Sequence, residues 1–385
     1  MIAVGSFDVI VVGVGAMGSS VCAHLAARGA RVLGIDRHAH PHEFGSSGGD
    51  TRLFRTSYFE HTDYVPLLRR ARAGWSRLEE DTGVTVFYET GVLYAGPADG
   101  HLIRDTEASA RAYEIPLEEL GDAADRFPQF ALPDGYRALF EPGGGLVLSA
   151  WAIGAYGGLA RHAGAQLRPR ERVLGWEETG DGVVVRTDAG RYTAAHLVLA
   201  AGAWTSALAP SLAGFLTPTR QVLGWVRPDD PDAFSPPRFA AWAIEDPSDG
   251  LYYGFPIVGG SSAMPERAGI KVGRHVPGPE ADPDTVDRGP APPEDQDFLP
   301  GVARYLPSAG TDVLSTMTCL YTNSPDGHFL VGALPGAERV SVAAGFSGHG
   351  FKFAPVIGEA LADLALEGST ELPIGFLDPD RFDGT

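Results

Sequence analysis

The chain has 385 residues, with 30 basic and 49 acidic side chains and a net charge of −19. At about 150 residues per domain, this length predicts two or three domains. The negative charge argues against nucleic acid or an anionic membrane surface as a partner. Only two cysteines occur, Cys22 and Cys319, which excludes a disulfide scaffold and a cysteine-based metal cluster. We expect no bound metal.

The N-terminal residues, MIAVGSFDVIVVGVG, lack a basic segment and a cleavage site. No apolar run approaches the roughly 18 residues that a membrane helix needs. We therefore expect a cytoplasmic protein without membrane contact.

The first element is a βαβ unit. Residues 7–12, FDVIVV, form a continuous apolar run, which is typical of a buried parallel strand. A helix is predicted over 16–28, with Gly29 ending it, and a second strand over 31–35.

The turn between strand and helix reads GVGAMG and matches a dinucleotide fingerprint. Gly13 allows the tight turn, Gly15 lets a pyrophosphate approach the backbone, and Gly18 lets helix and strand pack closely. Asp36 ends the second strand, where a carboxylate accepts from a ribose hydroxyl. The fingerprint alone does not separate FAD from NAD.

The middle of the chain is rich in β structure. A helix is predicted over 151–164 and a hairpin over 182–200, with its turn at 188–190. Two segments rich in proline and aspartate, 227–238 and 276–293, are predicted to be solvated surface loops.

The C-terminal part returns to an α/β pattern. A strand over 340–344, a glycine-rich loop over 345–350 and a helix over 351–367 follow one another. A second unit of this kind suggests that the two ends of the chain form one domain, into which the middle is inserted.

The chain has only two lysines, Lys271 and Lys352, among its 30 basic residues. Arginine cannot supply a compact ammonium whose pKa shifts on burial. A lysine kept in such a chain is therefore a candidate for chemistry of its own.

Two C-terminal segments, TMTCLYTNSPDGHF (316–329) and AAGFSGHGFKF (343–353), resemble those of the monomeric sarcosine oxidase family. That family includes N-methyltryptophan oxidase and belongs to the D-amino-acid-oxidase-like flavoproteins. The similarity extends to FDVIVVGVGAMG, to GSSGGDTRLFRTSYFEHTDYVPL (45–67), to AAGAW and to YYGFPI…GIKVGRHVPG. It is collinear over nearly the whole chain.

The resemblance implies an α/β fold with a discontinuous, Rossmann-like FAD-binding domain of glutathione-reductase-like topology. That domain would comprise 1–85, 150–219 and 323–385. Residues 86–149 and 220–322 would form an antiparallel-sheet substrate domain. We expect a monomer or a weak homo-oligomer.

The implied reaction is FAD-dependent oxidation of the C–N bond of a secondary or N-methyl amino acid. A hydride equivalent passes to the flavin, an imine forms, and O2 is reduced to H2O2. The FAD would be joined covalently to Cys319 through its 8α carbon, whereas Cys22 is expected to be a core thiol.

Matching the family motif residue by residue gives the remaining candidates. Arg55 and Lys352 would bind the substrate carboxylate, and Lys271 would promote the reaction with O2. Arg52, His275, Tyr253 and Tyr321 would lie at the reacting centre. The predicted cofactor-binding set is Gly13, Gly15, Ala16, Met17, Gly18, Asp36, Arg37, Ser46, Thr51, Arg52, Val173, Cys319, Gly345, Gly348, His349, Gly350 and Lys352.

Two departures from the family put the identity of the substrate in question. Gly48 stands where sarcosine-oxidising members carry a histidine, which suggests a larger or differently polar pocket. The segment 257–270 is longer than the family pattern, which suggests a lid or an oligomer contact.

Three alternatives stay open from the sequence. The substrate could be a cyclic amino or imino acid of the pipecolate or piperideine-carboxylate type, in specialised metabolism. The enzyme could be a flavin dehydrogenase that does not use O2. The fingerprint alone also fits an NAD-dependent dehydrogenase or a non-catalytic dinucleotide-binding protein.

Overall fold

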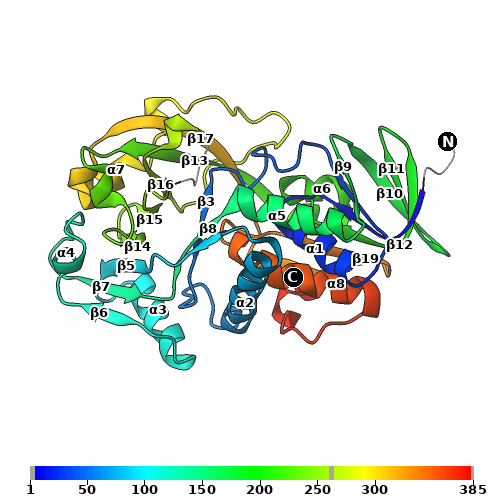
Figure 1. Cartoon of the computed structure of the whole chain (residues 1–385), viewed down its shortest axis with the longest axis horizontal. Helices are drawn as coiled ribbons and strands as arrows, with labels where there is room; N and C mark the ends of the chain where they lie inside the picture. The colour runs from blue at the N-terminus through cyan, green and yellow to red at the C-terminus, as the bar shows by residue number, and fades with distance from the viewer. Residues whose placement is uncertain (1–4, 260–263, 383–385) are drawn as a thin grey trace.

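A computed structural model describes residues 5–259 and 264–382. Two large sheets lie at opposite ends of an elongated molecule, with helices packed below and between them (Figure 1). The predicted mixed α/β architecture is confirmed. Within the described residues, no helix is long and apolar enough to cross a membrane.

The first sheet follows the order β10-β11-β12-β1-β2-β9, with β18 and β19 joined to it through β12. Its strands are β1 (Gly5–Val12), β2 (Val32–Asp36), β9 (Gln166–Pro169), β10 (Val173–Thr179), β11 (Gly182–Thr187), β12 (Arg191–Leu199), β18 (Leu330–Ala333) and β19 (Val340–Ala344). β1 pairs in parallel with β2 and β12, and β12 in parallel with β19. The predicted strands and the 182–200 hairpin are present within a residue or two.

The apolar run of β1 is buried on both faces. Val9 and Val11 belong to the core under the helices, whereas Ile10 and Val12 belong to the core on the opposite face. This alternation follows from the strand's period of two and explains why the whole run is apolar.

Three helices pack on one face of this sheet: α1 (Ala16–Ala27), α5 (Ser149–His162) and α8 (Ala354–Glu367). A fourth helix, α2 (Tyr64–Thr82), packs against α5 and α8. Gly29, with a φ of 82°, ends α1 as predicted. The C-terminal helix begins later than predicted, because residues Phe351–Phe353 form a 3₁₀ turn before α8.

The second sheet follows the order β17-β13-β16-β15-β14-β5-β7-β6 and is mostly antiparallel. Its strands are β5 (Val92–Pro97), β6 (Glu118–Leu120), β7 (Tyr136–Glu141), β13 (Thr217–Arg227), β14 (Ala241–Asp246), β15 (Gly250–Phe255), β16 (Ile270–Arg274) and β17 (Asp312–Asn323). A small third sheet joins β3 (Thr51–Phe54), β4 (Phe87–Tyr88) and β8 (Gly145–Leu148). The remaining helices are α3 (His101–Ala112), α4 (Ala123–Arg126), α6 (Thr205–Leu208) and α7 (Leu299–Tyr305).

Candidate active site

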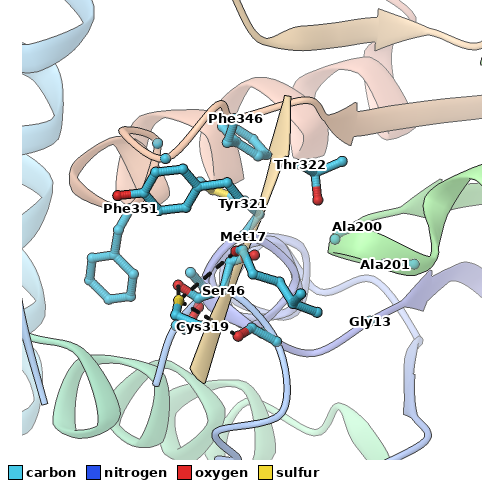
Figure 2. A pocket seen from close by; sticks show the side chains of 18 of the residues that line it. Gly13, Met17, Ser46, Ala200, Ala201, Cys319, Tyr321, Thr322, Phe346 and Phe351 are labelled. Carbon is cyan, nitrogen blue, oxygen red and sulfur yellow. Dashed lines mark hydrogen bonds between the residues drawn. The ribbon is translucent and has the colours of Figure 1, made fainter. Parts of the chain in front are cut away.

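One cavity runs from the carboxyl ends of the parallel strands to the face of β17. Its lining includes Gly13 after β1, Arg37 after β2, Ala200 after β12 and Gly345 after β19. Figure 2 shows Gly13, Ala200 and Ala201 on one side of it and Cys319 and Tyr321 on β17 at its centre. Ligands of open α/β sheets bind at this edge.

The nucleotide end of the cavity, as we name the part around residues 13–17 and 36–37, is shaped by glycines. A side chain at Gly13, whose φ is 89°, would meet the Ala200 carbonyl oxygen at 2.4 Å. A Cβ at Gly18 would lie 1.8 Å from the Gly13 oxygen, although Gly18 itself does not line the cavity. A Cβ at Gly15 would meet nothing within 4 Å, so this backbone is open to a ligand.

The first turn of α1 has no side-chain cap. Ala16 and Met17, which begin this helix, line the cavity. Uncapped backbone N–H groups at a helix N-terminus bind phosphate, so the structure offers a pyrophosphate cradle where the fingerprint predicts one.

Asp36 is buried beside that cradle. Its carboxylate accepts hydrogen bonds from the Val14 and His38 backbone N–H groups, each at 2.8 Å. Burial raises the pKa of Asp36, but these bonds and the neighbouring His42 outweigh it, so the net pKa is lowered. Asp36 is therefore a fixed anion at the edge of the cavity, which Val173 also lines.

The segment 276–293 is mostly exposed and irregular, as predicted, but one of its residues reaches the cavity. Asp284 lines the cavity and accepts hydrogen bonds from Arg37 Nη1 at 2.6 Å and from Trp204 Nε1 at 2.7 Å. The segment therefore crosses to the nucleotide end. Its aspartates predicted exposure to solvent, and one of them, Asp284, in addition pairs with Arg37, which follows β2 of the first sheet.

At the other end of the cavity, which we call the reactive end, Cys319 projects from β17. It is 2% exposed, and its Sγ lies 3.6 Å from the Ser46 carbonyl oxygen and 3.9 Å from Arg52 Nη2 (Figure 2 shows the contact with Ser46). Cys22, by contrast, is buried in the helical core, where burial raises the pKa of its thiol to about 12. Only Cys319 can meet a ligand in the cavity.

Carbonyl groups of the preceding loop surround Arg52. Its guanidinium donates to the carbonyls of Thr51 at 2.7 Å, Ser46 at 2.8 Å and Gly48. This ring of acceptors holds the positive charge beside Cys319.

Arg55 and Lys352 form a cationic wall of the cavity. The Arg55 guanidinium lies between the rings of Tyr58 and Phe59, at 4.2 and 3.9 Å from their centroids. Lys352 Nζ donates to the His349 carbonyl oxygen at 2.7 Å, and burial, followed by the charge of Arg55, places its pKa well below the ordinary value. Within the described residues, Arg55 Nη1 has no hydrogen-bond partner. An unpaired buried donor fits a carboxylate ligand.

Glu60 is a cavity residue that sequence reasoning missed. It forms an ion pair with Arg55, and its second oxygen, Oε2, has no partner in the part of the chain that the structure describes. Burial raises the pKa of Glu60, but the charge of Arg55 prevails and lowers it to about 2. A carboxylate five residues after Arg55 in RTSYFE was the available signal.

Lys271 lies behind the cavity wall and is not among its lining residues. It is 3% exposed, and its Nζ donates to the Thr51 carbonyl oxygen at 2.6 Å. Burial, followed by the charge of Arg52, lowers its pKa well below the ordinary value. Thr51 therefore contributes through its carbonyl group, which binds both Lys271 and Arg52, and it does not line the cavity.

Aromatic and imidazole groups also line the reactive end. His275 Nδ1 lies 3.1 Å from the Tyr321 hydroxyl, and Tyr253 lines the cavity beside them. Burial lowers the pKa of His275 to about 4, so its ring is neutral at pH 7. Tyr253 has its pKa raised by burial to about 12.

The glycine-rich loop over residues 345–350 also lines the cavity. Gly345, Gly348, His349 and Gly350 line the cavity, and a Cβ at Gly348 would lie 2.3 Å from the Tyr321 ring. His349 Nδ1 is 2.5 Å from the Tyr58 hydroxyl, and burial lowers the pKa of His349 to about 3.

The structure describes the surroundings of Gly48 and part of the longer segment 257–270. A Cβ at Gly48 would lie 2.1 Å from Met317 Cε, so Met317 occupies the space beside Gly48, and neither residue lines the cavity. Part of the longer segment, residues 260–263, lies outside the described residues. Its described remainder carries Arg267, which pairs with Glu43 and Asp50.

The fold and the site define a dinucleotide-binding oxidoreductase class. The profile of the FAD dependent oxidoreductase family matches residues 8–364. The chain belongs to the FAD dependent oxidoreductase family, and its cofactor is FAD. The open cradle at Gly15 and the uncapped α1 N-terminus fit the pyrophosphate of that cofactor.

Curated relatives and solved structures narrow this further. Monomeric sarcosine oxidase of Bacillus sp. (strain NS-129) is 39% identical over 382 residues, covering 97% of both chains. N-methyl-L-tryptophan oxidase of Salmonella arizonae is 36% identical over 365 residues, covering 94% of this chain and 95% of its own. The Tyr258Phe mutant of NikD, an unusual amino acid oxidase essential for nikkomycin biosynthesis, superposes with a TM-score of 0.84 at 30% identity, covering 97% of both chains.

Proposed function

We propose that this enzyme oxidises the C–N bond of a secondary or N-methyl amino acid to an imine and passes the electrons to O2, giving H2O2. The observation that carries the proposal is the cationic wall of Arg55 and Lys352, whose unpaired donor fits a substrate carboxylate at the reactive end. The family membership and the two groups of N-methyl amino acid oxidases among the relatives support it.

When bound, FAD accepts a hydride equivalent and returns electrons to O2. We assign the first sheet's segments, 1–85, 150–219 and 323–385, to the FAD-binding domain and 86–149 and 220–322 to the substrate domain. β13 begins at Thr217 and β17 ends at Asn323, so one boundary falls near the start of β13 and the other at the last residue of β17. The nucleotide end would hold the pyrophosphate and the ribose.

Covalent attachment of FAD at Cys319 is part of the proposal. Cys319 is the cavity's cysteine, and Arg52 lies 3.9 Å from its sulfur. A cysteine sulfur bonds to carbon as the thiolate, and a nearby guanidinium stabilises that charge.

The chain's own residues would do the following. Arg55 and Lys352 bind the carboxylate and orient the substrate, with Glu60 as the counter-ion of Arg55 before substrate arrives. Neutral His275, with Tyr253 and Tyr321, also lines the reactive end and would exclude water from it. Lys271 would promote electron transfer to O2, because its ammonium form stabilises the superoxide charge as that charge develops.

The test is a panel of candidate substrates, followed by H2O2 formation. Sarcosine and N-methyl-L-tryptophan represent the N-methyl class, L-proline and L-pipecolate the cyclic class, and glycine and L-alanine primary amines. Turnover greatest in the N-methyl class supports the proposal, and turnover greatest in the cyclic class supports the cyclic amino or imino acid as the substrate. Reduction of a dye without any H2O2 would instead identify a dehydrogenase. A purified protein without flavin colour would contradict the whole assignment.

A further inference from the structure

The loop formed by residues 43–51, which we call the collar, gathers the polar groups of the reactive end. Its Ser46, Gly48 and Thr51 carbonyls hold Arg52, and its Ser46 carbonyl contacts Cys319. Lys271 also donates to this loop, at Thr51. The collar's shape therefore decides where these three groups lie.

One side chain, Arg267, ties the two ends of the collar together. Its Nη1 and Nη2 donate to the two Glu43 carboxylate oxygens at 2.7 and 2.9 Å, and Nη1 also reaches Asp50 Oδ1 at 3.1 Å. The guanidinium is 9% exposed and lies 4.7 Å from the Trp225 ring centroid. Two-pronged arginine–carboxylate pairs fix geometry as well as charge.

The collar needs such a restraint. Asp50 has a φ of 65°, a backbone conformation that non-glycine residues adopt only when their surroundings impose it. Glu43 Oε1 also accepts from the Gly49 N–H at 3.2 Å, so the carboxylate that binds Arg267 shapes the turn as well.

Arg267 is also connected to the strand that carries the cysteine. Its Nη2 lies 3.8 Å from Met317 Sδ on β17. Met317 and Cys319 are two residues apart on this strand and therefore face the same side. Arg267, which contacts Met317, and Cys319 thus both contact the collar on the same side of β17.

We propose that Arg267 is a positioning residue that fixes the collar so that Arg52 lies beside Cys319, and that it thereby sets the rate at which Cys319 is joined to FAD. This inference rests on the proposed attachment. That reaction breaks the S–H bond of Cys319 and one C–H bond of the flavin 8α methyl group and forms a C–S bond. Two protons and two electrons in total go to O2, which becomes H2O2.

The experiment follows acid-insoluble flavin while each purified, incompletely loaded full-length protein is incubated with excess FAD in air. Arg267→Leu should attach flavin at least tenfold more slowly than the wild type. Arg267→Lys should recover part of the rate, because an ammonium can pair with a carboxylate but cannot hold both oxygens of Glu43 in the same way. Glu43→Gln tests the same contact from the other side, and it decides the matter if Arg267→Leu does not fold.

Arg137 supplies a matched control. It also pairs with two carboxylates, Glu107 and Glu119, at 2.6 and 2.7 Å, but these carboxylates lie outside the collar. Arg137→Leu should attach flavin at the wild-type rate. Wild-type attachment in Arg267→Leu, or equal slowing in Arg137→Leu, overturns the role of Arg267 while leaving the attachment itself intact. No acid-insoluble flavin in the wild type would overturn the attachment and this inference with it.

Discussion

The nucleotide end of the cavity comes mostly from one continuous stretch, the βαβ unit of β1, α1 and β2, whereas the reactive end comes from segments far apart in the chain. Gly13, Gly15 and Asp36 act through backbone shape and one carboxylate. The reactive end instead brings together side chains from β3, β15, β17 and the loop before α8. A local motif can bind a nucleotide, but opposed charges and a thiol in one cavity require the assembled fold.

The difference predicts that substitutions at the reactive end change chemistry while FAD remains bound at the other end. Cys319→Ser should abolish covalent attachment completely, because the oxygen of serine does not replace the thiolate as nucleophile. The variant should still be purified yellow. Intact mass and acid precipitation measure this outcome, and flavin that stays in the acid pellet of Cys319→Ser would place the attachment elsewhere.

Lys271→Met sharpens the comparison within the reactive end. This variant keeps the length of the side chain but removes the amino group. Reoxidation of the reduced FAD by O2 should therefore slow by about 10²–10⁴-fold, equivalent to about 3–5 kcal/mol. Reduction by substrate without O2 should slow far less. Stopped-flow absorbance separates the two halves, and Lys271→Arg should rescue only partly. Unchanged reoxidation would make Lys271 a structural lysine that holds Thr51.

The cationic wall gives the next effect. Arg55→Ala or Lys352→Met should weaken the binding of the substrate by about 30-fold to several thousand-fold, since removing one partner of a buried charge pair costs about 2–5 kcal/mol. Because burial lowers the pKa of Lys352, its charge is lost as pH rises, and binding of an unreactive carboxylate should weaken toward alkaline pH. Calorimetric titration measures this trend, and a flat profile in the wild type would remove Lys352 from carboxylate binding.

The smallest effect concerns stability at low pH. Burial lowers the pKa of His349 to about 3 in the folded chain, against about 6.5 when unfolded. The unfolded state therefore binds more protons below pH 6.5, and stability is lost as pH falls from there toward 3. His349→Gln should lessen this loss by about 2–4 kcal/mol between pH 7 and pH 4. Denaturant unfolding at these pH values is the measurement, and equal losses in both proteins would contradict a neutral buried imidazole.

The sequence predicted the nucleotide end well because its physics is local. The motif is local: the apolar run, the three glycines and Asp36 lie within 30 residues of one another. Resemblance to a family brought the reactive residues together, and the structure places most of them in one cavity. The ion-pair partners of these residues could not be predicted, because no motif contains them. Glu60 pairs with Arg55 only in the folded chain, and Asp284 pairs with Arg37 across 247 positions of sequence. Met317 filling the space at Gly48 is likewise a consequence of strand packing that no single motif contains.

The central claim is that a carboxylate held by Arg55 and Lys352 presents a secondary amine for oxidation. The most direct test compares kcat/KM for sarcosine with that for dimethylamine, which is the same amine without the carboxylate, in one coupled H2O2 assay. We predict that sarcosine exceeds dimethylamine by at least about 30-fold in the wild type, as loss of a buried charge contact requires, and that Arg55→Ala narrows the ratio. Equal kcat/KM values for the two amines in the wild type would contradict the account.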